Sequence, residues 1–148
     1  MTEIVSFSHR RDINPIRILF IYPNTYGMNM LPPAIALFNA LLKRDGHEVD
    51  IFDATYYSTD YGNDSDGSKA DNLNVVPYDE DEIGIRRKET YWLDDIKDKV
   101  VVFQPDLIAI SSTEDMWQLG ILLLEGIRSY KLKNNTPVIA GGVFPTFA

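Results

Sequence analysis

The sequence predicts an α/β fold, a three-layer sandwich in which a mostly parallel sheet lies between helices. Short apolar runs without alternation are typical of strands that are covered on both faces. Stretches of helical periodicity separate these runs, so that strands and helices alternate along the chain. The chain has 148 residues, of which 45% are hydrophobic and 24% charged. This composition suits one globular domain with a sizeable core.

The first strand is predicted at residues 17–22 (RILFIY), a nearly continuous apolar run. Turn-forming residues fill the loop at 23–32. Pro33 suits the first turn of a helix, whose apolar residues recur three and four apart until Gly46 stops it. A second strand at 47–53 (HEVDIFD) alternates apolar and polar residues, which favours a place near the edge of the sheet.

Residues 54–90 show no periodic pattern and carry nine acidic against four basic side chains. A stretch of this length without regular structure is uncommon in a compact domain. We interpret it as an acidic insertion above the carboxyl edge of the sheet. A solvated charged surface explains its composition better than a metal site does.

Two further units complete the visible pattern. A helix is predicted at 91–103 and a fully buried strand at 107–110 (LIAI). A single helix follows from about 114 to 131, and Ser112 or Thr113 can cap its first turn.

The last apolar run, Val138 to Ala140, has no alternation, and we expect both of its faces to be covered. Gly141 and Gly142 then mark a sharp turn or a close approach to the backbone, and a proline-bounded loop follows.

This order of elements predicts a flavodoxin-like or Rossmann-like sheet with strand order 2-1-3-4-5. Only four strands are visible, so a helix and a fifth strand are expected beyond residue 148. The chain then divides into an N-terminal arm, residues 1–15, and one domain, residues 16–148. The arm could instead supply the last strand.

Three loops should meet at the carboxyl edge, where open parallel sheets bind ligands. They span residues 24–30, 111–114 and 141–146, and they hold hydroxyl groups and glycines but no histidine and no nucleophile paired with a base. We therefore expect this edge to hold a large flat or long thin ligand, and we predict no catalytic residue and no metal ligand.

Four segments in this order resemble the N-terminal cobalamin-binding domain of B12-dependent radical SAM enzymes. They are RILFIYPN, MLPPAIALFNALLKRDGHEVDIFDAT, PDLIAISS and VIAGGVFPTFA. The resemblance implies a Rossmann-like domain that holds a corrin over the carboxyl edge and faces a radical SAM barrel, commonly for methyl transfer. The candidate cofactor-binding residues are then Asn24, Thr25, Tyr26, Gly27, Met28, Met30, Ser111, Ser112, Thr113, Glu114, Gly141, Gly142, Val143, Phe144 and Pro145.

The chain departs from better-known cobalamin domains in the loop after the first strand. Those domains carry Asp-x-His-x-x-Gly there, with the histidine on cobalt, whereas no histidine lies between Arg10 and Gly46. The resemblance therefore implies a cobalamin without a histidine ligand. The chain also has no cysteine, so the [4Fe-4S] cluster and S-adenosylmethionine are expected only in a downstream domain, and this chain is not expected to be active alone.

Tyr56, Tyr57 and Tyr61 could form a lid over the corrin, although an ordinary amphipathic loop is the favoured interpretation.

The net charge and several short motifs bear on other classes of function. A net charge of -8 argues against nucleic acid and anionic membranes as partners, and the absence of a signal segment favours the cytoplasm. Residues 25–27 weakly suggest a phosphate loop, so a flavodoxin-like FMN or nucleotide binder remains an alternative. A receiver domain is disfavoured because the third strand ends without an aspartate. A non-catalytic interaction domain remains open.

Overall fold

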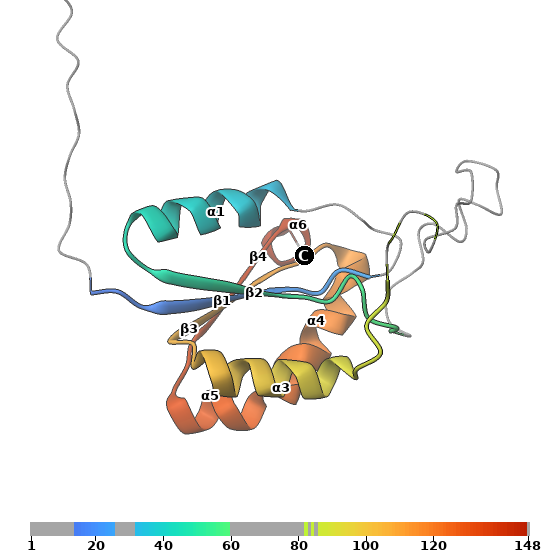
Figure 1. Ribbon diagram of the computed structural model, residues 1–148. Coiled ribbons are helices and arrows are strands. Elements are labelled where there is room, and N and C mark those ends of the chain that lie inside the picture. The colour runs from blue at the N-terminus through green and yellow to red at the C-terminus, as the bar shows by residue number, and fades with distance from the viewer. Residues whose placement is uncertain (1–13, 26–31, 60–81, 83, 85, 148) are drawn as a thin grey trace, which may run out of the picture.

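The computed structural model of the chain describes residues 14–25, 32–59, 82, 84 and 86–147. Within these residues, four strands form one parallel sheet in the order β2-β1-β3-β4. The predicted α/β class and the order of its first four strands are confirmed (Figure 1). The strands are β1 (Arg17–Tyr22), β2 (Glu48–Asp53), β3 (Leu107–Ser111) and β4 (Val138–Gly141).

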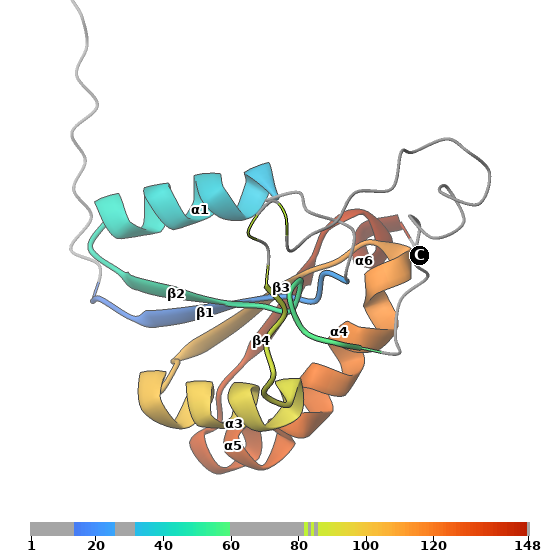
Figure 2. The same ribbon diagram turned by 45° about the vertical axis from the view of Figure 1, so that its right-hand side comes forward.

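The helices cover the two faces of the sheet unequally. On one side lies α1, while α3, α4 and α5 lie on the other (Figure 2). A short helix, α6, follows β4 and contacts α4. The bounds are α1 (Pro33–Arg44), α3 (Trp92–Phe103), α4 (Glu114–Gly126), α5 (Arg128–Asn134) and α6 (Val143–Phe147). No helix in the described part of the chain is both long enough and apolar enough to cross a membrane.

The larger core lies between the sheet and the helices α3 and α4. Leu19 and Ile108 of the sheet are fully buried against Ile96 of α3 and Leu119 of α4. Burial of each such aliphatic side chain contributes about 1.5–3 kcal/mol. Gly120 permits this close packing, because a Cβ atom there would lie only 2.7 Å from Cδ1 of Ile110.

The core under α1 is smaller. Ile18, Phe20 and Tyr22 of β1 point to this side, and Ile35 is the buried residue that α1 contributes. On the same helix, Leu37 is 58% and Phe38 is 52% exposed. Helix α1 is therefore attached to the sheet by much less apolar contact than α3 or α4.

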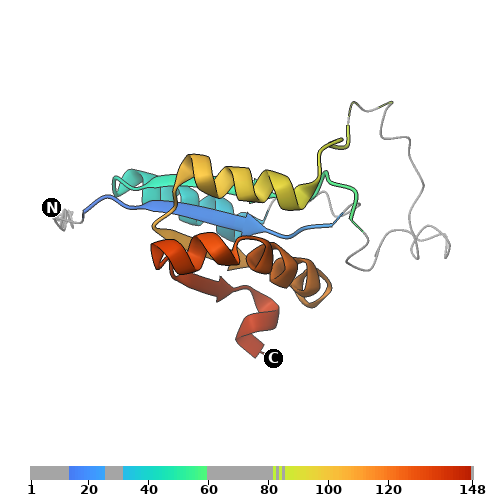
Figure 3. The same cartoon turned by 90° about the horizontal axis from the view of Figure 1, so that it is seen from below.

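Strand β4 departs from the prediction that both of its faces are covered. It is the outermost described strand next to β3 (Figure 3), and Ile139 is 58% exposed. Its apolar run resembles that of a central strand, but among the described strands it has a neighbour on one side only. The expectation of a buried strand at 138–140 was wrong for this reason.

The helical segments after β3 also differ from the prediction. The single helix expected at 114–131 is two helices, because Ile127 leaves helical geometry with φ -105° and ψ 15°. At the break, Gly126 lets α3 come close, since a Cβ atom there would lie 2.6 Å from Cδ2 of Leu93. The loop expected after Gly142 forms helix α6.

The two ends of the acidic insertion are held to the domain by Tyr57. Its ring is 1% exposed and stacks on Phe52 at 5.6 Å between centroids, and its hydroxyl donates to Oδ2 of Asp95 at 2.7 Å. Nζ of Lys88 lies 2.9 Å from that hydroxyl and 4.3 Å from the ring centroid. A lid role for Tyr57 is therefore wrong, because the side chain belongs to the core; Tyr56 is partly exposed, and Tyr61 lies outside the described residues.

We predict that Tyr57→Phe lowers the free energy of unfolding by about 1 kcal/mol at pH 7, because the partly buried hydrogen bonds of its hydroxyl with Asp95 and Lys88 are lost. Burial, and then the hydrogen bond to Asp95, raise the pKa of Tyr57 above its ordinary 10.0. The native state thus holds the phenol proton more tightly than the unfolded state does. The resulting contribution to the free energy of unfolding is complete below pH 10 and is lost as the pH rises further. Urea unfolding of wild type and variant at pH 7 and pH 10.5 measures both effects.

The exposed Tyr91 provides the control, since Tyr91→Phe should leave stability unchanged at both pH values. A gap between wild type and Tyr57→Phe that stayed constant from pH 7 to pH 10.5 would contradict the expected loss.

Candidate functional site

The carboxyl ends of the four strands form one edge, with the order of the loops set by the sheet. The chain leaves β1 toward β2 on one side, whereas β3 leads toward β4 on the other. Such a switch point, here between β1 and β3, is where open α/β sheets hold ligands. Two of the three predicted loops, at 111–114 and 141–146, are described in full. The third is described only at Asn24 and Thr25, so Tyr26, Gly27, Met28 and Met30 lie outside the described residues.

The loop after β1 is tied to the loop after β2 by buried polar groups. Nδ2 of Asn24 donates to Oγ1 of Thr55 at 2.9 Å, and Asn24 is fully buried. Thr55 in turn donates from its backbone N (2.9 Å) and from its hydroxyl (2.5 Å) to Oδ1 of Asp53. Asn24 therefore joins the two loops, and Thr25 is also buried.

Sequence reasoning missed Asp53 and Thr55. The signal was present, because an Asp two residues before a Thr at the end of a strand commonly forms such a local turn. Burial, and then the charge of Asp53, also raise the pKa of Tyr22 at the end of β1.

The loops after β3 and β4 are in direct backbone contact. The backbone N of Ser112 donates to O of Gly141 at 3.0 Å, and Ser112 is 3% exposed. Gly142 has φ +102°, and a Cβ atom there would lie 2.4 Å from O of Ser112. The close approach indicated by this glycine is thus made by the neighbouring loop of the same chain.

The first turn of α4 lacks the predicted side-chain cap. Thr113 occupies the N-cap position without a hydrogen bond from its side chain to the helix. Oγ of Ser112 donates instead to O of Thr113 at 2.8 Å. Glu114 and Asp115 stand in the first helical turn and are exposed.

Helix α6 rests on α4 through aromatic contact. The ring of Phe144 lies 5.5 Å from that of Trp117 between centroids, tilted by 51°. Pro145 is half-buried, whereas Val143 is 65% exposed. Phe144 therefore has a packing role, and Val143 is free to contact another molecule.

A path of small and exposed residues runs along the α1 side of β3 and β4. Phe20 faces α1, and in the register of the sheet it pairs with Ala109, which pairs with Ile139. Two positions further on, Ser111 pairs with Gly141. We call Ala109, Ser111, Ile139 and Gly141 the open strip.

The residues of the open strip are accessible from outside the protein. Ala109, Ser111 and Gly141 are half-buried, and Ile139 is 58% exposed. A Cβ atom built on Gly141 would come no closer than 4.0 Å to O of Ile110, so the space beside it is open. The strip leads to the carboxyl edge at Ser111 and Gly141.

The chemical groups at this edge suit binding. Its described loops offer hydroxyl groups, backbone amides and carbonyl groups, together with the carboxylates of Asp53 and Glu114. Among the described residues, no group of three or more His, Asp or Glu side chains is placed to hold a metal ion. The one histidine in that part of the chain, His47, lies before β2 at the opposite edge and accepts a hydrogen bond from the backbone N of Ile16 at 3.2 Å.

Comparisons of the chain with protein-family models, with curated proteins and with solved structures find no match.

We predict that Gly142→Ala destabilises the protein by more than Gly46→Ala does. Both glycines have similar positive φ, at +102° and +95°, which L side chains rarely adopt. Only at Gly142 would the added Cβ meet another atom, O of Ser112 at 2.4 Å, because nothing lies within 4 Å at Gly46. Overpacking of this kind adds roughly 1–3 kcal/mol to the cost, which chemical denaturation measures. Equal losses in the two variants would show that the contact between the two loops contributes nothing.

Proposed function

We propose that this chain is a cobalamin-binding domain that holds B12 without a histidine ligand for a radical SAM enzyme. The observation that carries the proposal is the open strip beside the carboxyl edge. A corrin with its nucleotide tail is a flat body with a long thin extension, and the small residues of the strip leave a path for such an extension.

Each part of the strip has a role in this proposal. Ala109 and Ile139 supply apolar surface, Ser111 supplies a hydroxyl group for a polar atom of the tail, and Gly141 lets the ligand approach the backbone. The contact between Ser112 and Gly142 holds the two loops together at the mouth of the strip. The protein thus binds and orients the cofactor.

The cofactor itself supplies a cobalt centre that can carry a methyl group. The [4Fe-4S] cluster and S-adenosylmethionine belong to a radical SAM domain that we propose as the partner in the same polypeptide, acting on a small-molecule substrate in the cytoplasm. We propose a cobalt without a histidine ligand because the sequence has no histidine between Arg10 and Gly46, where the loop after β1 lies. Binding of FMN is the alternative outcome, and an absorption spectrum of the loaded protein separates flavin from corrin.

We predict that Gly141→Leu weakens hydroxocobalamin binding at least about tenfold, which corresponds to about 1.4 kcal/mol. The new side chain points into the open strip, where it meets no protein atom closer than 4.0 Å at Cβ, so the fold is retained. Equilibrium dialysis with absorbance detection measures binding, and thermal unfolding checks the fold.

Ala140→Leu is the matched control. Ala140 is the preceding residue of the same edge strand, and it pairs with Ile110, which faces α4. This variant should bind as wild type does. If wild type shows no binding, or if both variants bind equally well, the open strip does not hold cobalamin.

We further predict that the Co(II) state of the bound cofactor shows no hyperfine splitting from a protein nitrogen. Protein labelled with ¹⁵N makes the test specific, because a protein imidazole would give a doublet, whereas a nitrogen of the unlabelled cofactor gives a triplet. Paramagnetic resonance after anaerobic reconstitution is the measurement. A doublet from the labelled protein would contradict binding without a histidine ligand.

A further inference from the structure

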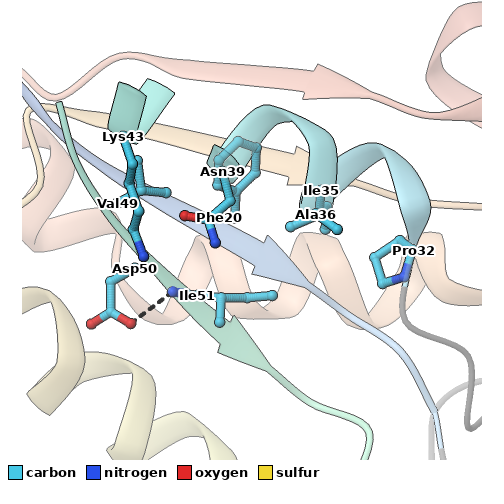
Figure 4. A pocket seen from close by; sticks show the side chains of 9 residues that line it. All are labelled: Phe20, Pro32, Ile35, Ala36, Asn39, Lys43, Val49, Asp50 and Ile51. Carbon is cyan, nitrogen blue, oxygen red and sulfur yellow. Dashed lines mark hydrogen bonds between the residues drawn. The ribbon is translucent and has the colours of Figure 1, made fainter. Parts of the chain in front are cut away.

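A hollow lies between α1 and the edge strand β2, away from the open strip (Figure 4). It has a volume of about 240 Å³. Ile35 and Ala36 form its helix wall, Val49 and Ile51 form its strand wall, and the ring of Phe20 lines it from β1. The walls are apolar, and the volume is below the roughly 300–1,000 Å³ of sites for drug-sized ligands. The hollow is large enough for a small molecule.

Asn39 is the unusual residue of this hollow. It lies four residues after Ile35, on the stripe of α1 that faces the sheet, where an apolar side chain is expected. Its Oδ1 atom is buried and has no hydrogen-bond partner among the described residues. Buried polar atoms in proteins are almost always paired. This oxygen is a candidate acceptor for a donor on a ligand, which it would meet once the side chain turns to expose it to the hollow that Asn39 lines.

At the end of the hollow near Lys43, the nearby carboxylate already has a cationic partner. The carboxylate of Asp50 is engaged by Nζ of Lys99 at 2.5 Å and by the backbone N of Ile51 at 2.8 Å. Lys43 lines the same hollow and forms no ion pair with any described residue. It also stands in the last turn of α1, one turn after Asn39. An anionic group on a ligand would neutralise this ammonium group.

We infer that the hollow between α1 and β2 binds a small aromatic carboxylic acid that also carries an N–H or O–H donor. The ring lies between the apolar walls, the donor pairs with Oδ1 of Asn39, and the carboxylate pairs with Lys43. This site is separate from the open strip, which lies on β3 and β4 and shares no lining residue with it. The inference therefore does not depend on cobalamin.

Indole-3-carboxylate is the probe, because its N–H group and carboxylate stand at opposite ends of a flat ring. In ¹H–¹⁵N spectra of the full 148-residue protein, its addition should shift the side-chain amide signals of Asn39 and the backbone signals of Ile35 and Val49. Lys43→Gln should weaken binding about tenfold, because one charge-assisted hydrogen bond is lost. Lys133→Gln is the matched control, since this lysine also stands in the last turn of a helix but lies outside the hollow.

Two further comparisons test the roles assigned to the residues. Asn39→Leu places an apolar side chain in the hollow, so it should abolish binding while the protein stays folded, and neutral indole should bind wild type more weakly than the acid does. The inference is overturned if indole-3-carboxylate shifts none of the three signals, if Lys43→Gln and Lys133→Gln bind it equally, or if Asn39→Leu retains binding. Saturation with hydroxocobalamin should leave the affinity for the probe unchanged.

Discussion

The whole arrangement depends on β1, which is paired with a strand on each side and covered on both faces. Leu19 and Ile21 are fully buried toward α3 and α4, while Ile18 and Phe20 are buried toward α1. Because β2 and β3 run parallel to β1, their carboxyl ends lie at the same edge as its own. The segments that directly follow Tyr22, Asp53 and Ser111 are thereby neighbours although they are far apart in the sequence. Any ligand at this edge is held by a frame that the burial of β1 keeps rigid.

The sequence was informative where local pattern and burial agree. A continuous apolar run identified β1 and β3, alternation placed β2 at the edge, and the proline and glycine at its two ends bounded α1. The run at 138–140 has the same composition as a central strand, and the number of its neighbours is a property of the sheet that no local pattern contains. No proline marks the break between α4 and α5 at Ile127. Beside it, Gly126 lies close to Leu93, which is more than thirty residues earlier in the sequence.

The position of the candidate site could be predicted from the sequence. The roles of its residues were harder to predict. The strand ends were found because parallel strands bring them together. The partners of the side chains depend on contacts across the sequence: Asn24 on Thr55, Gly142 on Ser112, and Tyr57 on Asp95. In each case the residue type suggested an available polar group or an open space, and another part of the chain uses it. The open strip could not be predicted, because it follows from the exposure of β4.

The weak attachment of α1 has a consequence for the dynamics of the molecule. A helix that buries a single side chain can separate from the sheet at a lower free energy than global unfolding, whereas α3 and α4 are held by the larger core. The α1–β2 hollow is directly walled by this helix, so its shape exists only while the helix is seated. A molecule bound there would raise the free energy of opening, and amide protons of α1 would then exchange with solvent more slowly than in the empty protein. Occupancy of the α1–β2 hollow and the local stability of helix α1 are therefore thermodynamically linked.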